Sequence, residues 1–527
     1  MTTLNNSVLP SLPSLPSLPL TFYFEDTLNG CYSNLPPHLL SLGFIHVPTP
    51  SPSSATHLNF SYNPSPHTSP NYYLNHLPTL PSLLSNKETL SLAIPLARHI
   101  PPTYTLSSKP STLTLVEHFY TNIAASLLQY AIYSKNLQHQ PAVLGAITDA
   151  TSACHVILAH YATGPTLPAI DTDATTVQYG AMYTLSAATW ASLHATLLSL
   201  TPPLPPLPPI PSTSPQTLLY NTLLPHLPFP PDPYSLYITK SPSASRGVTV
   251  EVTKQPGLTN AMTGRVVQKY VSEVYTVPNP TPVTPVASVE EAVKVDFRVW
   301  VLLVNDGSGG SPQVYVWDAF LVRLCGRPYD RNCMERERHL CNFSVGGGQQ
   351  GGGGQPHGEG WQLIWSEQAF VKYLDQCTGE GKQWRDGKRE MKKIIKESVT
   401  GMEAGVGSVR GEEATNDQLL APPPSLIALF PLFSNTNFVR AGYELLGYDF
   451  VMDDGMKPYL LEVNVSPGLT KRGIVECGRG GEWGCFDVDK SIEQMIGGVF
   501  ERTVNKWHGK EKMERRRKEG DLWEEMR

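Results

Sequence analysis

The sequence predicts an α+β fold built around an antiparallel sheet. From residue 234 onward, short apolar runs typical of strands recur, among them "LYITK", "VTVEVTK", "RVVQKYV" and "KVDFRVWVLLV". Near the end of the chain, "YELLGYDFVM" and "YLLEVNV" flank the turn residues Asp453, Asp454 and Gly455, which is a hairpin signal. Strand runs of this kind, interspersed with helical segments, are typical of an α+β domain.

The composition divides the chain into successive segments. Prolines, 49 in all, concentrate in segments that favour extended conformations and cannot continue a helix, which predicts a tail and a linker. Residues 114–200 are rich in alanine and leucine at helical spacing, which predicts a helical insertion. The predicted segments are a disordered Pro-rich tail at 1–19, an amino-terminal α/β module at 20–113, the helical insertion at 114–200, a Pro-rich linker at 201–233, the strand-rich domain at 234–505 with a flexible Gly-rich insert at 346–358, and a charged C-terminal helix at 506–527.

Composition also narrows the class of protein. A chain of 527 residues has material for two or three domains, and a formal net charge of −6 does not indicate a nucleic-acid partner. The eight cysteines form no Cys-x-x-Cys pair and have no histidines at zinc spacing, which favours a reducing, cytoplasmic compartment. The opening segment lacks the positive region of a signal peptide, and no apolar run approaches about 20 residues, so we expect no membrane insertion.

A carboxylate and an amide stand inside the apolar hairpin. Side chains alternate along a strand, so Glu462 and Asn464 share one face while their apolar neighbours share the other. Folding the hairpin about its turn places Asp449 roughly opposite Glu462, so three oxygen-bearing side chains converge. Two carboxylates repel unless a cation lies between them, and a hard divalent ion such as Mg²⁺ suits oxygen ligands. An ordinary surface hairpin with polar residues facing water is the alternative.

Further polar residues lie in the strand-like runs that precede the hairpin. Lys240 ends one run and is followed by "SPSASRG", which is able to form a phosphate-binding loop. Lys269 stands inside an apolar strand, where a lysine either reaches water or meets an anion. In "KVDFRVWVLL", Lys294, Asp296 and Arg298 share one face, which is either a solvent-facing edge or the floor of a polar cleft. Arg323 and Asn342 complete the set. Lysines for phosphates, acids for a metal and arginines for a second anion are what a nucleotide-dependent reaction needs.

The succession of these runs resembles the tubulin-tyrosine ligase family. The resemblance is carried by "YITKSPSASRG", "VVQKYV", "VDFRVWVLL", "FLVRLCGRPY", "HLCNFS" and "YELLGYDFVMDDGMKPYLLEVNVSPG", which cover roughly 234–505. A weaker likeness reaches the amino-terminal segments "LTFYFEDTLNGCYSNLPPHLLSLGF" and "YYLNHLPTLPSLLSNKETLSLAI". The resemblance implies an ATP-grasp fold. It also implies an ATP-dependent carboxylate–amine ligase that joins a free amino acid to the acidic C-terminal tail of tubulin through an acyl phosphate.

The same resemblance implies a role for each matching residue. The implied ATP contacts are Lys240 and Lys269 for the phosphates, Gln268, Tyr270 and Val271 for the adenine, and Lys294 and Asp296 near the nucleotide. The implied Mg²⁺ ligands are Asp449, Glu462 and Asn464, and the implied catalytic residues are Arg298, Arg323 and Asn342. The arginines are implied to hold the acceptor or incoming amino acid and the transferred phosphate. The family's His-Leu-Thr-Asn motif appears here as His339-Leu340-Cys341-Asn342, and a glycine tract replaces its usual basic continuation.

The resemblance leaves the choice of amino acid open. Tyrosine is slightly favoured, because the amino-terminal module resembles that of tubulin-tyrosine ligase and no long basic extension follows the hairpin. Glutamate is the close alternative, since "NVSPGL" looks more like the glutamate- and glycine-adding branch. A catalytically silent tubulin-binding member and a ligase for a non-tubulin protein are further alternatives. The implied location is the cytoplasm, in association with the cytoskeleton, a cilium or a basal body.

Overall fold

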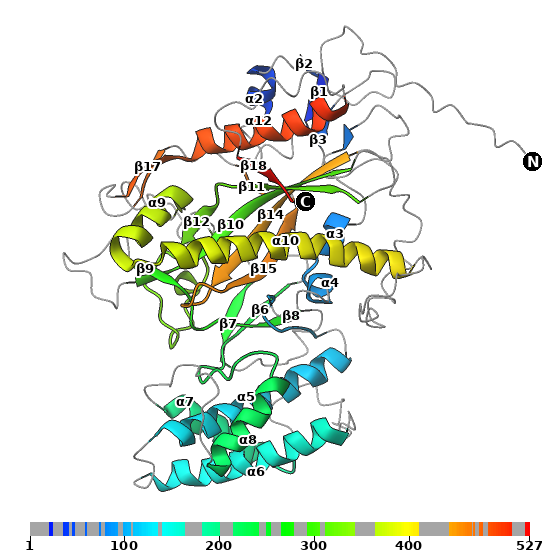
Figure 1. Cartoon of the computed structure of the whole chain (residues 1–527). Helices are drawn as coiled ribbons and strands as arrows, with labels where there is room; N and C mark the ends of the chain where they lie inside the picture. The colour runs from blue at the N-terminus through cyan, green and yellow to red at the C-terminus, as the bar shows by residue number, and fades with distance from the viewer. Residues whose placement is uncertain are drawn as a thin grey trace, which may run out of the picture.

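A computed structural model confirms the α+β class within the parts of the chain that it describes (Figure 1). The described residues are 21–24, 35–41, 45–47, 58–60, 73–74, 80–92, 99–106, 109–134, 140–163, 182–200, 214–241, 249–254, 265–278, 292–305, 311–342, 364–409, 442–465, 467–469, 474–477, 483–507 and 522–526. The predicted tail at 1–19 and the predicted glycine-rich insert at 346–358 lie outside these ranges.

A large mixed sheet of 12 strands forms the centre of the molecule. Its strands are β1 (Thr21–Phe24), β2 (Ile45–His46), β3 (Leu58–Phe60), β4 (Tyr73–Leu74), β9 (Thr276–Pro278), β10 (Ala292–Asn305), β11 (Gln313–Trp317), β12 (Leu321–Leu324), β13 (Ile364–Ser366), β14 (Gly442–Met452), β15 (Pro458–Val465) and β18 (Trp523–Glu525). The main path runs β13-β12-β10-β14-β4-β3-β1-β2. The first four strands pair in parallel and join the antiparallel part at Leu74 and Gly442. The amino-terminal strands therefore extend the same sheet.

Two smaller antiparallel sheets complete the strands. The first runs in the order β5 (Thr103–Thr105), β8 (Val266–Lys269), β6 (Tyr237–Lys240) and β7 (Glu251–Thr253), and the second pairs β16 (Ile474–Cys477) with β17 (Gly484–Asp487). The two faces of the four-stranded sheet differ. Tyr104, Tyr237 and Val267 pack into a core of helices on one face, so Gln268 and Lys240 belong to the opposite face.

Four helices pack on the four-stranded sheet and form a lobe at the bottom of Figure 1. They are α5 (Lys109–Tyr133), α6 (Pro141–Thr163), α7 (Ala187–Ser199) and α8 (Pro215–Leu223). The lobe extends beyond the predicted helical insertion, because α8 lies in what we predicted to be a proline-rich linker. Ser214 caps this helix by accepting a hydrogen bond from Thr217 N, and Pro215 occupies the first turn, where a missing N–H is tolerated. That part of the linker prediction was wrong.

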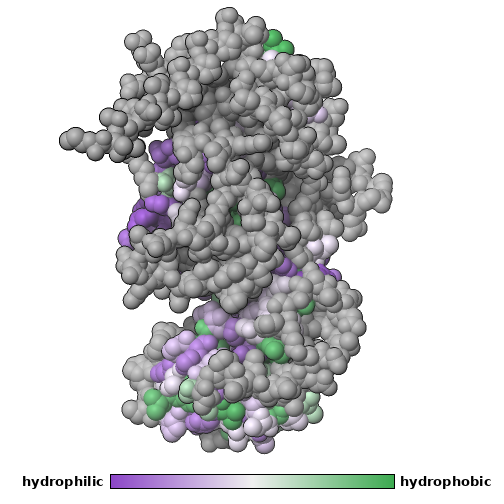
Figure 2. Space-filling view, turned by 90° about the vertical axis from the view of Figure 1, so that its right-hand side faces the viewer, coloured by the Kyte–Doolittle hydropathy of each residue, from purple (hydrophilic) through white to green (hydrophobic). Residues whose placement is uncertain are grey.

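One helix of the lobe contradicts the statement that no apolar run approaches membrane-spanning length. Among the described residues, Pro141–Ala162 in α6 is long and apolar enough to cross a membrane by length and composition alone. About 33% of this window is buried. Ala150, Cys154 and Ile157 on its inner face belong to the core of the lobe. Figure 2 shows apolar and hydrophilic side chains intermixed over the visible surface of the lobe.

The two faces of β10 belong to two different cores, as strand alternation requires. Val295, Phe297 and Val299 lie in the core beneath α10 (Gly381–Val409), which crosses the front of the sheet in Figure 1. Trp300 and Leu302 lie in the core beneath α12 (Val488–Trp507). Lys294, Asp296 and Arg298 occupy alternate positions in phase with Trp300, as predicted. The other helical elements are α2 (Leu35–Ser41), α3 (Leu80–Ser85), α4 (Lys87–Leu92), α9 (Glu367–Tyr373), the 3-10 helices η4 (Leu224–His226) and η7 (Arg336–Arg338), and the π-helix η8 (Leu374–Thr378).

The prediction of a charged helix at 506–527 is wrong for the last residues of this segment. Residues Trp523–Glu525 form strand β18, which pairs antiparallel with β11. The indole of Trp523 is buried against α12, where its Nε1 donates to Met495 O at 3.1 Å. Gly498 of α12 leaves room for this ring, since a Cβ there would lie 2.4 Å from Trp523 Cδ1. Docking of one buried aromatic and pairing at a sheet edge outweigh the local helical preference of the charged tail.

Candidate active site

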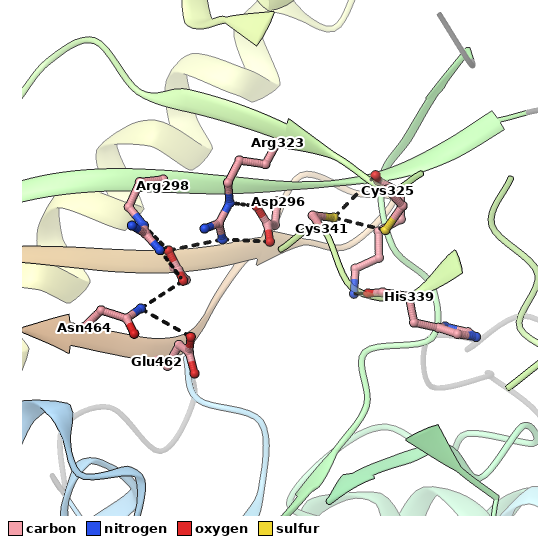
Figure 3. A network of polar contacts seen from close by, with 10 residues as sticks. Asp296, Arg298, Arg323, Cys325, His339, Cys341, Glu462 and Asn464 are labelled. Atoms are coloured by element: carbon pink, nitrogen blue, oxygen red, sulfur yellow. Dashed lines mark hydrogen bonds and ion pairs between the residues drawn. The ribbon is translucent and has the colours of Figure 1, made fainter. Parts of the chain in front are cut away.

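The register of the β14–β15 hairpin brings the predicted metal ligands together. Asp449 pairs with Glu462 and Gly447 with Asn464, so the predicted opposition of the two acids is confirmed. The Asn464 amide lies between the two carboxylates, because its Nδ2 donates to Asp449 Oδ2 at 3.1 Å and to Glu462 Oε1 at 3.3 Å (Figure 3). Asn464 thus links the two carboxylates into one group, which we call the metal-ligand group. Their role as metal ligands stays a prediction.

Strand pairing also explains a chain of alternating charges beside this group. Arg298 of β10 pairs in register with Asp449 of β14, and Arg323 of β12 pairs with Asp296 of β10. Arg298 donates to Asp449 from Nε at 2.5 Å and from Nη2 at 3.0 Å. Arg323 donates to Asp296 at 2.5 and 2.8 Å, and its Nη2 also lies 3.2 Å from Asp449 Oδ1. The predicted arginines therefore meet the predicted metal ligand directly (Figure 3).

The electrostatics of this chain favour the charged forms of Asp449 and Arg323, whereas burial raises the pKa of the Asp296 carboxyl above its ordinary value although Arg323 opposes this. Burial raises the pKa of the Asp449 carboxyl, but Arg298 and Arg323 outweigh it and hold the pKa below its ordinary value. Burial opposes the charge on Arg323 as well, and Asp296 and Asp449 together raise its pKa. Asp449 is only 2% exposed, so removing its charge would leave the half-buried Arg298 without its carboxylate and Arg323 with Asp296 alone.

Lys240 and Gln268 lie next to the metal-ligand group on the same side of the four-stranded sheet. Lys240 Nζ donates to Gln268 Oε1 at 2.9 Å and to Leu461 O at 3.2 Å, one residue before Glu462. Gln268 Nε2 in turn donates to Thr103 Oγ1 at 2.9 Å. Burial lowers the pKa of Lys240 to about 8, although Glu462 partly offsets this by attraction. The ammonium is therefore still mostly charged at neutral pH, and a bound anion would raise its pKa.

Sequence reasoning missed Lys87, which the amino-terminal segment brings to the same place. Its side chain is 8% exposed, and its Nζ lies 3.6 Å from Glu462 Oε2. Lys87 begins α4 directly after Asn86, whose Oδ1 accepts the N–H groups of Glu88 and Thr89 as a helix cap. The capping pattern in "SNKET" indicates a helix start, but it carries no information about a partner 375 positions further along the chain. The long 3.6 Å separation from Glu462 leaves the Lys87 ammonium able to bind a phosphate as well, as a compact point charge on a flexible side chain.

Lys294 lies at the predicted hinge instead of the metal-ligand group. Its Nζ donates to Tyr270 OH at 3.0 Å and to His339 O at 2.9 Å. The Tyr270 hydroxyl also lies 3.0 Å from His339 Nδ1, and burial lowers the pKa of that imidazole to about 4. Val271 follows as a buried residue. The structure therefore joins Lys294 and Tyr270, as the prediction of a common nucleotide site requires, through a buried polar network.

The Lys269 side chain does not lie where we predicted it. Gln268 and Lys269 are consecutive in β8, so their side chains point to opposite faces, and only Gln268 faces Lys240. Lys269 Nζ instead pairs with Asp232 Oδ2 at 2.5 Å and donates to Leu236 O at 3.1 Å. Its charge is already matched by a buried carboxylate. The predicted phosphate contact of the Lys269 side chain is therefore not supported.

The His-Leu-Cys-Asn segment lies at the carboxyl end of β12. Cys341 Sγ lies 3.2 Å from Cys325 Sγ and donates to Lys294 O at 3.6 Å, so this segment is packed against the hinge lysine (Figure 3). Asn342 follows as a half-buried residue. Its predicted catalytic role stays a prediction. The loop after Lys240, predicted to approach phosphate, lies largely outside the described ranges.

The donor set fits a hard metal ion together with an anion. Within the described residues no group of three or more His, Cys, Asp or Glu side chains is placed to hold a metal. A metal here would use the two carboxylates, and the Asn464 oxygen only after the amide, whose Nδ2 now donates to both acids, turns over. Four cations face three carboxylates around this point, which leaves a surplus of positive charge for a phosphate-bearing ligand. The cations are Lys87, Lys240, Arg298 and Arg323, and the carboxylates are Asp296, Asp449 and Glu462.

Comparison with known proteins places this site in a family. A model described as the tubulin-tyrosine ligase family matches residues 211–475, about half of the chain. Tubulin polyglutamylase TTLL5 of Mus musculus is 26% identical over 238 residues, which is 44% of this chain and 15% of that protein. Tubulin polyglutamylase ttll-5 of Caenorhabditis elegans is 28% identical over 187 residues, 33% of this chain and 21% of that protein. Tubulin polyglutamylase ttll6 of Danio rerio is 27% identical over 192 residues, 34% of this chain and 20% of that protein.

The chain thus spans about a fifth or less of the length of these three relatives. The matched region includes β6, β8, β10, β12, β14 and β15, the strands that carry the charged cluster, apart from Lys87. The α+β architecture with an ATP-grasp domain, expected from the sequence motifs, agrees with this match. On the evidence of the matched model, the chain belongs to the tubulin-tyrosine ligase family.

Proposed function

We propose that the chain is an ATP-dependent ligase that adds glutamate to the C-terminal tail of tubulin. The observation that carries the proposal is that Asn464 contacts both Asp449 and Glu462, and that Asp449 also contacts two arginines. Oxygen ligands for a metal and cations for phosphate, side by side in a partly buried site, are the requirements of phosphoryl transfer. An ordinary surface hairpin does not explain them, since Asp449 is buried.

Different parts of the site would hold Mg²⁺ and ATP. Asp449, Glu462 and Asn464 would hold Mg²⁺, and Lys240 with Lys87 would hold the phosphates of ATP. The segment from Gln268 to Val271 would hold the adenine. When bound, ATP supplies the phosphoryl group that converts a carboxylate of the acceptor into an acyl phosphate, which the amino group of a free amino acid then attacks.

Arg298 and Arg323 are placed to stabilise negative charge during this transfer. Asp449 and Asp296 hold both guanidinium groups by paired hydrogen bonds, so their orientation is set before any substrate enters. Preorganised cations in a water-poor site stabilise developing charge with little reorganisation. They also attract the acidic tail and reduce its repulsion from the triphosphate. No side-chain nucleophile is needed for this chemistry.

Glutamate replaces tyrosine as the proposed amino acid. The sequence narrowly favoured tyrosine, on the likeness of the amino-terminal module. Each of the relatives named above carries the name tubulin polyglutamylase, at 26–28% identity. Their names agree with the alternative that "NVSPGL" suggested. We further propose that the activity is cytoplasmic and associated with the cytoskeleton.

The proposal is tested by offering one amino acid at a time. Purified chain is incubated with tubulin, ATP and Mg²⁺ together with glutamate, tyrosine or glycine, and the tail peptides are analysed by tandem mass spectrometry. We expect glutamate on the side chains of internal glutamates. Tyrosine at the terminal carboxylate would instead support tyrosine ligation. Addition to another protein but not to tubulin would show that the ligase has a different acceptor.

A further inference from the structure

Helix α5 of the lobe contacts two segments that in turn contact the predicted adenine hinge: Asp232 and strand β5. His118 and Asn122 lie one turn apart on this helix, so they project from the same side. His118 contacts Tyr104 of β5, and Asn122 contacts Asp232. Helix α5 lies in the region that we predicted to be an insertion, and none of the site residues predicted from the sequence belongs to it.

Asn122 forms a two-point contact with the backbone of Asp232. Its Nδ2 donates to Asp232 O at 3.0 Å, and its Oδ1 accepts from Asp232 N at 2.8 Å. Asn122 is 6% exposed and Asp232 is 7% exposed, so water does not readily replace either bond. An amide that satisfies both backbone groups of one residue fixes the position of that residue.

The Asp232 side chain in turn contacts two residues of the hinge region. Its Oδ2 pairs with Lys269 Nζ at 2.5 Å and accepts from Ser272 Oγ at 2.8 Å. Lys269 and Ser272 flank Tyr270 and Val271, the residues predicted to meet the adenine. One carboxylate therefore holds both ends of the hinge, and burial of the Lys269 ammonium makes this partner necessary.

A second contact of α5 involves β5, the strand that pairs with β8. The hydroxyl of Tyr104 in β5 lies 2.6 Å from His118 Nδ1 on α5. The preceding residue, Thr103, accepts the hydrogen bond from Gln268 Nε2 and thereby fixes the side chain that binds Lys240. Helix α5 thus reaches β8 by two separate paths.

We propose that α5 positions the nucleotide hinge, and that Asn122 and Asp232 are positioning residues for ATP binding. The inference rests on the proposed function, because it concerns the same ATP site. Asn122 acts through Asp232, and Asp232 acts through Lys269 and Ser272. Loosening them is expected to weaken adenine binding while the charged cluster remains in place.

The test compares ATP affinity with thermal stability in the full chain. Isothermal titration calorimetry with Mg²⁺ and ATP is performed on wild type, Asn122→Ala and Ser272→Ala, and each melting temperature is measured without nucleotide. Leu197→Ala is the matched control, because Leu197 is 2% exposed in the core of the same lobe but lies on a different helix, α7. The loss of two buried hydrogen bonds predicts a dissociation constant about tenfold higher for Asn122→Ala. The loss of one predicts about threefold for Ser272→Ala.

The possible outcomes distinguish failure of the positioning role of α5 from failure of the proposed ATP-dependent function. An increase in the dissociation constant for Asn122→Ala and Ser272→Ala, with little change for an equally destabilised Leu197→Ala, supports positioning. Equal increases for Asn122→Ala and Leu197→Ala would show a general effect of lobe stability and overturn the inference. Unchanged affinity in both test variants would also overturn it, while ATP binding by wild type would leave the proposed function intact. If Asn122→Ala does not fold, Ser272→Ala decides. Wild type that binds no ATP would refute both.

Discussion

Replacing Glu462 with glutamine separates the predicted chemistry from the fold. The Glu462 carboxylate makes two contacts, with Asn464 Nδ2 at 3.3 Å and with Lys87 Nζ at 3.6 Å, and its side chain is 19% exposed. Glutamine has nearly the same volume and retains an oxygen that accepts from Asn464. The remaining loss is one long, partly solvated ion pair, which contributes about 1 kcal/mol or less to stability. For a chain of this size the melting temperature should fall by no more than about 4 °C.

The expected loss of activity is much larger than the loss of stability. If Glu462 is a metal ligand, the variant loses one of only two carboxylates in the donor set. Removing one preorganised group that stabilises transition-state charge lowers kcat by about 10² to 10³-fold, which corresponds to about 2.7–4 kcal/mol. The same change therefore costs several times more in catalysis than in folding.

The assay measures incorporation of labelled glutamate into tubulin together with thermal unfolding of the same protein sample. Glu335→Gln is the matched control, because Glu335 is 47% exposed and also pairs with a basic partner, Arg338, outside the cluster. We expect the control to retain nearly full activity. Glu462→Gln activity within a few-fold of wild type would refute the metal assignment. A melting temperature lowered by more than about 8 °C would show that Glu462 is a structural residue.

Three further predictions test other parts of the account. Asp449→Asn should destabilise the fold by about 3 kcal/mol in a denaturant titration, since it removes the carboxylate of the half-buried Arg298 and leaves Arg323 with Asp296 alone. A loss under about 1 kcal/mol would contradict the charge chain. ATP affinity measured by calorimetry should weaken by up to about tenfold per pH unit as the pH rises above about 8, because Lys240 then loses its proton. Lys240→Arg should remove this pH dependence. A wild-type ATP affinity that does not change with pH would contradict the role of Lys240. Gly498→Ala should lower stability by about 1–3 kcal/mol, because the new methyl group displaces Trp523. Gly145→Ala is the control, because a Cβ at Gly145 meets open space. Equal melting temperatures for the two variants would show that the C-terminal strand does not depend on the contact between Gly498 and Trp523.

The hairpin could be predicted from the sequence because local rules determine it. The turn residues set where the chain reverses, and the alternation of side chains places Glu462 and Asn464 on one face. The exact pairing of Asp449 with Glu462 also needs a register shift between Asp449 and Phe450, which the sequence did not predict. The alternation of polar and apolar residues in β10 likewise predicted that Asp296 and Arg298 share a face. Strand-to-strand register then brought Arg323 to Asp296, which the sequence alone did not predict.

Other features depended on contacts between distant parts of the chain. Lys87 reaches Glu462 only because the amino-terminal segment packs beside β15, and no local pattern encodes that packing. The direction of Lys269 was missed because every residue of β8 is buried, so hydrophobicity does not distinguish its two faces. The strand at Trp523–Glu525 required a free edge on β11 and a gap at Gly498, neither of which is visible in a charged, helix-compatible tail.

The measurement that most directly tests the account is the Mg²⁺ dependence of ATP binding to the full chain. Calorimetric titrations with ATP are performed in the presence of Mg²⁺ and in the presence of a chelator. The contact of Asp449, Glu462 and Asn464 beside four cations predicts tight binding with Mg²⁺ and at least tenfold weaker binding without it. ATP affinity that is the same under both conditions, or no detectable binding under either, would contradict the claim that this cluster is a magnesium-nucleotide site.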